Sequence, residues 1–126
     1  MAYNRKPTLE CETNPSADCA VEAAMAVLSG KWKLKIYKML RSNDALRFHE
    51  IKTEIGAISD KTLTAQLKEM EEDNLLTRTV YPEVPPRVEY NLTPLGKKLN
   101  NVLLALDQWG RAYVYEMRGG ILPELD

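Results

Sequence analysis

Residues 58–96 read ISDKTLTAQLKEMEEDNLLTRTVYPEVPPRVEYNLTPLG, and three local patterns follow one another along them. A short polar turn leads into an amphipathic stretch with helical spacing. Two runs of β-forming residues come next, one on each side of a proline-rich tip. The order predicts a helix followed by an antiparallel β-hairpin.

The predicted helix begins after Ser59, whose side-chain oxygen can accept a hydrogen bond from a backbone N–H of the first turn. Asp60 favours the positive end of the helix dipole. One stripe of this helix is apolar and must pack inward, and it consists of Leu63, Leu67 and Met70. Residues 47 or 48 to 55 predict a shorter helix before it, with Gly56 as a left-handed stop. A helix, a turn of about four residues and a capped helix form a helix-turn-helix unit.

The outer face of the capped helix carries small, hydrogen-bonding and cationic side chains, a set that can enter a major groove of DNA. These residues are Lys61, Thr62, Ala65 and Lys68. Carboxylates crowd the other end of the helix, where they oppose the dipole and would stay outside the groove. They are Glu69, Glu71, Glu72 and Asp73. An ordinary solvated surface helix is the alternative interpretation.

The hairpin is predicted from residues 77–81 and 87–92, which are rich in β-branched and aromatic side chains or alternate between apolar and polar. Residues 82–86 contain three prolines, which cannot continue either strand because they lack the N–H. Arg87 at the base of this tip can reach a phosphate or a minor groove. It can equally pair with Glu83 or Glu89.

Two more helices are expected upstream and one downstream. The first runs over about 19–29, with Asp18 as a plausible cap and Gly30 after its end. The second contains Trp32 and Leu40, and its other face carries Lys31, Lys33, Lys35 and Lys38, for which plain solvation is the simple explanation.

The last helix covers about 94–118, with Thr93 as its cap and proline in its first position. Its apolar residues continue for about 36 Å at 1.5 Å per residue, more than so small a domain can cover. They pack either on a second copy or back over the first helix. Gly110 within this helix marks either a bend or a close approach of another backbone.

The chain has 126 residues, 44% of them hydrophobic and 28% charged, which predicts one folded domain. We expect an N-terminal arm over 1–18 and the domain over 19–126. Residues 1–12 lack the apolar core of a secretory signal, so a cytoplasmic location is the default. The net charge is −1, but residues 31–100 hold 13 basic against 10 acidic side chains. Local positive charge is what phosphate contacts require.

Chemistry-bearing residues are few. Cys11 and Cys19 cannot supply four metal ligands, and His49 lacks a recognisable partner, so we expect no metal or other cofactor. The helix dipole lowers the pKa of a thiol at Cys19, whereas the carboxylates of Asp18 and Glu22 raise it. Because no carboxylate pair, phosphate loop or nucleophile-base arrangement is present, an enzyme is the weakest interpretation.

Together these segments resemble the HxlR family of bacterial transcriptional regulators over roughly residues 19–110. The resemblance lies in residues 19–22 (CAVE), 30–33 (GKWK), 47–50 (RFHE), 58–63 (ISDKTL), 67–71 (LKEME), 80–90 (VYPEVPPRVEY) and 92–96 (LTPLG). It implies a dimeric winged helix-turn-helix protein that binds operator DNA and, in several members, responds to reactive small molecules or redox stress. The family usually has proline after its first cysteine, where this chain has Ala20.

The sequence therefore predicts a mainly α-helical winged helix-turn-helix regulator, most simply a repressor that binds a pseudo-palindromic site as a homodimer. We expect groove contacts from Ser59, Lys61, Thr62, Ala65 and Lys68, and backbone contacts from Lys31, Lys33, Arg47 and Arg87. Oxidation or electrophile capture at Cys19, with Cys11 as a resolving thiol, is the hypothesis for a signal. Two alternatives remain, a protein-interaction module and a sensor of a small aromatic effector near Trp109 and Tyr113.

Overall fold

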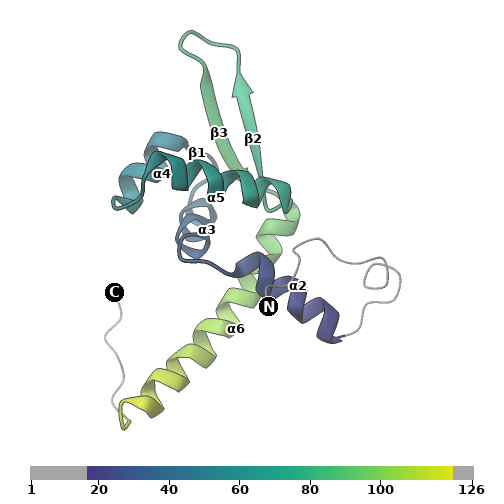
Figure 1. Cartoon of the computed structure of the whole chain (residues 1–126), viewed down its shortest axis with the longest axis vertical. Helices are drawn as coiled ribbons and strands as arrows, with labels where there is room; N and C mark the ends of the chain where they lie inside the picture. The colour runs from purple at the N-terminus through teal and green to yellow at the C-terminus, as the bar shows by residue number, and fades with distance from the viewer. Residues whose placement is uncertain (1–16, 121–126) are drawn as a thin grey trace.

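Five helices and three short strands make up residues 17–120, the part of the chain that the computed structural model describes. The elements are α2 (Ala17–Leu28), α3 (Lys33–Ser42), β1 (Leu46–Arg47), α4 (Phe48–Ile55), α5 (Asp60–Glu72), β2 (Leu76–Tyr81), β3 (Arg87–Leu92) and α6 (Pro94–Met117). In Figure 1 the β2–β3 hairpin extends beyond the helices at one end, and α6 extends away from them at the other. The predicted helix-turn-helix followed by a β-wing is confirmed.

The wing is a three-stranded antiparallel sheet with the order β1-β3-β2. Strands β2 and β3 pair along their whole length, from Leu76 opposite Leu92 to Tyr81 opposite Arg87. The sequence did not predict β1, which adds only Leu46 and Arg47 to the outer edge of β3. This short strand anchors the base of the wing to the start of α4.

The core lies between α3, α4, α5 and the base of the sheet. Its largest fully buried side chains are Ile36, Ile51, Leu63, Leu67, Met70 and Leu76. Burying one such side chain contributes about 1.5–3 kcal/mol relative to leaving it in water. The predicted apolar stripe of α5 therefore supplies half of these residues and fixes which face of that helix is left outside.

Local hydrogen bonds set the start of α5 as predicted. The side chain of Ser59 accepts a hydrogen bond from the backbone N of Thr62 at 3.1 Å. Gly56 has a φ of +80°, which glycine adopts more readily than other residues, and ends α4. An ion pair between Lys52 of α4 and Asp60 of α5 joins the two helices across the turn.

The start of α6 is held closely against the end of α5. Thr93 accepts from the backbone N of Gly96 at 2.9 Å and donates to the carbonyl of Asn74 at 2.6 Å. A Cβ on Gly96 would lie 2.1 Å from the carbonyl oxygen of Leu75, so only glycine fits there. No close contact surrounds Gly110 among the described residues, and α6 runs through it uninterrupted to Met117.

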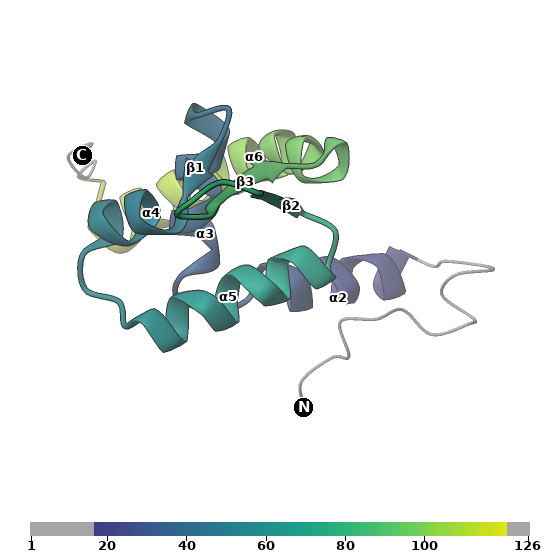
Figure 2. The same cartoon turned by 90° about the horizontal axis from the view of Figure 1, so that it is seen from above.

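Helix α2 begins earlier than the sequence suggested. Asp18 lies in its first turn instead of capping it, since the helix starts at Ala17. Helix α2 lies beside the first half of α6, with which it forms an apolar groove described below. Figure 2 shows α5 with one long side unobstructed by the other elements. No helix within residues 17–120 is both long and apolar enough to cross a membrane.

Candidate nucleic-acid interface

The outer face of α5 brings together the groove residues expected from the sequence. Lys61, Ala65 and Lys68 are exposed, and Thr62 is half-buried beside them. Within residues 17–120 neither lysine takes part in an ion pair. Ser59 has two local bonds, because its hydroxyl also donates to the hydroxyl of Thr62 at 2.9 Å. The outer face of α5 thus presents two lysines outside any ion pair, Lys61 in its first turn and Lys68 two turns later, next to small side chains.

The C-terminal end of α5 is acidic on its outer side. Glu71 and Glu72 are exposed there, and Asp73 ends the helix. Phosphates are repelled by this end and attracted by the other, where the positive end of the helix dipole adds to Lys61. The charge gradient along α5 favours an approach to DNA through its first two turns.

Lys33 is placed differently from the prediction. Its residue is only 4% exposed, and its ammonium forms an ion pair with Glu69 of α5. A buried ammonium in that position cannot reach a DNA phosphate, so the assignment of Lys33 as a backbone contact was wrong. Lys31 remains exposed, with its ammonium 4.7 Å from the centroid of the Trp32 ring.

The two candidate arginines flank the wing. Arg47 is exposed at the end of β1, where its backbone N donates to Glu50 Oε1 at 2.8 Å. Arg87 is restrained by two carboxylates, one in the tip of the wing and one on its own strand: its Nε lies 2.9 Å from Glu83 Oε2, and its Nη1 lies 3.7 Å from Glu89 Oε2. Its guanidinium also stacks 3.9 Å from the centroid of the Tyr81 ring. Arg87 therefore has three intramolecular partners that a DNA phosphate would have to compete with.

Sequence reasoning missed one basic residue of the wing. Arg78 lies in β2 directly opposite Tyr90, so both side chains emerge on the same face of the sheet. Tyr90 is buried, whereas Arg78 beside it on β2 is exposed. The signal available in the sequence was the spacing of Leu76, Arg78 and Val80, because residues at every second position of a strand share one face. Arg78 adds a cation to the side of the wing that continues from the core.

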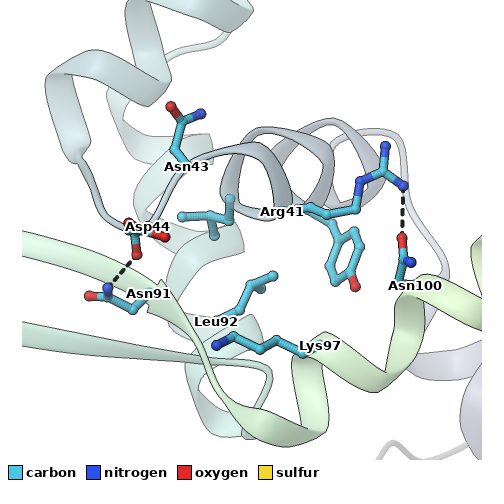
Figure 3. A pocket seen from close by; sticks show the side chains of 9 residues that line it. Arg41, Asn43, Asp44, Asn91, Leu92, Lys97 and Asn100 are labelled. Carbon is cyan, nitrogen blue, oxygen red and sulfur yellow. Dashed lines mark hydrogen bonds between the residues drawn. The ribbon is translucent and has the colours of Figure 1, made fainter.

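A polar pocket of about 290 Å³ lies between α3, β3 and the start of α6 (Figure 3). Arg41 donates to Asn100 Oδ1 at 3.2 Å on one side of it, and Asn91 donates to the carbonyl of Asp44 on the other.

Trp109 and Tyr113, the proposed aromatic effector site, lie further along α6. Both are exposed, and their rings stack with centroids 5.4 Å apart.

Helices α2 and α6 display a large apolar surface. On α6 six exposed apolar side chains recur at helical spacing and share one face; they are Leu95, Val102, Leu106, Trp109, Tyr113 and Met117. Exposed Leu104 and Tyr115 lie on the other side of the helix. Val21 and Met25 are exposed on α2. An apolar groove of about 330 Å³ separates the two helices and is lined by residues of both, including Val27 and Leu99. Apolar surface of this extent is typical of a protein interface.

Cys19 lies in the first turn of α2 and is half-buried. It is disulfide-bonded in the structure. The other proposed redox residue, Cys11, lies outside the described residues. His49 is exposed on α4, and among residues 17–120 no group of three or more His, Cys, Asp or Glu could hold a metal ion.

Residues 27–118 match the model of the HxlR-like helix-turn-helix family. The chain belongs to the HxlR family. An uncharacterized HTH-type transcriptional regulator of Methanothermobacter thermautotrophicus is 46% identical over 95 residues, covering 75% of this chain and 72% of the relative. The HTH-type regulator YdeP of Bacillus subtilis is 36% identical over 111 residues, covering 87% and 85%. This HxlR-family chain is therefore a DNA-binding transcriptional regulator and not an enzyme.

Solved structures share its fold. A MarR-family regulator from Enterococcus faecalis V583 has a TM-score of 0.75 and 33% identity, over 83% of this chain and 94% of that one. The redox regulator HypR in its reduced form has a TM-score of 0.71 and 34% identity, over 79% and 98%. Reduced YodB from Bacillus subtilis has a TM-score of 0.66 and 36% identity, over 71% and 88%. The HxlR-family chain thus has the winged-helix architecture of known regulators.

Proposed function

We propose that this protein represses transcription by binding a specific operator with α5 in the major groove. The observation that carries the proposal is the division of α5 into two faces. Its apolar stripe is buried in the core, and the opposite face presents Lys61, Ala65 and Lys68 to solvent. Lysine and small side chains suit contacts to phosphates and base edges respectively.

Backbone contacts would come from cations around this helix. Lys31, Arg47 and Arg87 keep the role expected from the sequence, and exposed Arg78 joins them. Such contacts fix the register of a protein on the duplex but carry no sequence information. Base discrimination would rest on the small set of residues along the first two turns of α5.

We propose further that the protein is a homodimer built on α2 and α6. The apolar face of α6 includes Trp109, 67% exposed, and Met117, 69% exposed, in the single chain. A second copy related by a twofold axis would cover the apolar surfaces of α2 and α6 in both copies at once. Two α5 helices would then meet half-sites about 34–36 Å apart, one turn of DNA.

The DNA-binding proposal is tested by Lys61→Ala on an operator obtained by selection from random fragments. If Lys61 contacts a phosphate, affinity should fall by a similar factor on every sequence, and the salt slope should become shallower by about 0.9. Arg111→Ala, on the distant half of α6, is the charge-matched control. Unchanged affinity of Lys61→Ala would rule out this placement of α5. A wild-type gel shift without sequence selectivity would favour a protein-interaction module instead.

We also propose that Cys19 is a thiol sensor of oxidants or electrophiles. Two observations support this proposal: Cys19 is disulfide-bonded, and HypR and YodB are similar chains, the first described as a redox regulator. Disulfide formation would transfer two electrons and two protons from two thiols to an oxidant, with Cys11 as the resolving thiol. The change would alter the dimer and release DNA. Operator release by diamide should disappear in Cys19→Ser, and a response that persists there would remove this proposal.

A further inference from the structure

An ion pair connects α3 to α5, the helix that we propose to contact base edges of DNA. Lys33 begins α3, and its Nζ contacts Oε1 of Glu69, 36 residues later in α5. The lysine side chain is 5% exposed and the glutamate side chain 32% exposed. The Lys33 ammonium has left water almost completely and needs a carboxylate partner, because without one it would remain buried and uncompensated.

The pair occupies a position where it can control the angle of α5 about its own axis. A second ion pair, Lys52 with Asp60, holds the first turn of α5, and Lys33 with Glu69 holds its third turn. An apolar stripe alone tolerates small rotations, since dispersion contacts are not directional. A charge-assisted hydrogen bond requires a defined distance and direction.

Small rotations are enough to matter at the DNA face. The side chains of a helix lie about 5–6 Å from its axis. A rotation of about 20° would therefore move the outer side chains by roughly 2 Å, which separates a donor from a base edge that it should approach to about 3 Å. Lys61 and Ala65, on the face opposite the core, would both be displaced.

We propose that Lys33 and Glu69 are positioning residues that set the rotation of α5 and thereby the ability of this regulator to discriminate between DNA sequences. The proposal rests on the proposed function of α5 as the DNA-reading helix. It gives the buried lysine a role in recognition without any contact to DNA. Glu69 acts in the same way although its own charge repels phosphate.

Simple electrostatics makes a different prediction for both residues. Removing the positive charge of Lys33 should weaken binding to all DNA, and removing the negative charge of Glu69 should strengthen it. A positioning role predicts instead that either change weakens operator binding and leaves binding to unrelated DNA nearly unaltered. Glu69→Gln is therefore decisive, because the two explanations give opposite signs.

The main experiment uses the apolar replacement Lys33→Met/Glu69→Leu, which removes both charges of this pair together. Replacing a buried ion pair with apolar residues of similar volume is often neutral or stabilising, so this variant should fold. Circular dichroism and thermal unfolding check that it does. The control Asp107→Asn/Arg111→Gln removes an exposed ion pair of α6 whose Nε–Oδ2 distance is 2.8 Å.

Dissociation constants for the selected operator and for a scrambled duplex are measured over a range of salt concentrations. We expect the ratio of the two constants to fall by about tenfold or more in the apolar variant, the effect of losing one good base contact. The salt slope should stay unchanged, because no phosphate contact is lost. The exchanged pair Lys33→Glu/Glu69→Lys should recover part of the discrimination.

Two results would overturn the inference. One is an unchanged ratio in the folded apolar variant, and the other is tighter operator binding by Glu69→Gln. Failure of the proposed function is seen separately, as unchanged operator affinity of Lys61→Ala. If Lys61→Ala weakens binding but the apolar pair retains discrimination, α5 still binds DNA and only the positioning role is lost.

Discussion

The hydroxyl of Tyr37 donates a hydrogen bond to the carbonyl of Gly96 at 2.8 Å and so joins α3 to the first turn of α6. The two residues are 59 positions apart, and the bond is buried. Burial raises the pKa of Tyr37 above its usual value of 10.0, and the nearby guanidinium of Arg41 opposes that shift. This contact connects the core of the DNA-binding unit to the proposed dimer helix.

Tyr37→Phe should destabilise the protein by about 0.5–1.5 kcal/mol at neutral pH, the usual net value of one hydrogen bond. Because the folded-state pKa of Tyr37 is raised, its contribution is complete below pH 10 and is lost as pH rises through that pKa. The deficit of the variant should therefore shrink above pH 10. Urea unfolding at pH 7 and above pH 10 measures the difference in unfolding free energy between wild type and variant. The control is Tyr113→Phe, because Tyr113 is exposed. A deficit that grows with pH would contradict the assignment.

Gly96→Ala should destabilise the fold, because its Cβ would lie 2.1 Å from a backbone oxygen that cannot move away cheaply. Overpacking of this kind costs about 1–3 kcal/mol, or more where backbone must shift. The matched control is Gly110→Ala, which meets no atom within 4 Å in the described chain. It should be neutral or stabilising by up to about 1 kcal/mol. Thermal unfolding of both variants checks the contrast.

Glu83→Gln should strengthen DNA binding by removing the carboxylate that lies 2.9 Å from Arg87 Nε. Arg87 would then be freer to contact a phosphate, and the salt slope should steepen by up to about 0.9. Gel shifts over a salt series measure both effects. Glu116→Gln removes an equal charge at the far end of α6 and should change neither. Equal effects of the two variants would mean that only net charge matters.

Trp109→Glu should convert the proposed dimer to monomers, since it introduces a charge into the exposed apolar face of α6. Gln108→Glu adds the same charge one residue earlier, about 100° around the helix and outside the apolar face, and should leave the assembly intact. Light scattering after size-exclusion chromatography distinguishes the two. A monomeric wild-type protein would exclude the dimer altogether, and with it cooperative occupation of two half-sites.

Much of the fold could be predicted because its signals are local. Ser59 and Thr93 each accept a hydrogen bond from a backbone N three residues ahead, and both helix starts follow directly from them. The apolar stripe of α5 and the proline-rich tip of the wing are equally local patterns. Each can be recognised without knowing which distant segment the element will meet.

The missed features all depend on distant partners. Strand β1 has only two residues and exists through its pairing with Tyr90 and Glu89 of β3. Lys33 looked like one of several solvated lysines, because nothing near it in the sequence indicates that Glu69 will neutralise it. Gly96 gave no sign that its backbone would touch Leu75. In these cases tertiary packing decides the role of a residue.

The length of α6 gives the molecule a mechanical property. The helix is fastened to the wing unit at Gly96 and continues to Met117, 24 residues in all, or about 36 Å. If its outer end is clamped to a second copy, a tilt of only about 5° there would move the opposite end by roughly 3 Å, close to the 3.4 Å rise between neighbouring bases on one strand. A small change of angle in the proposed dimer interface would thus displace the DNA-binding unit by about one base-pair step relative to its half-site.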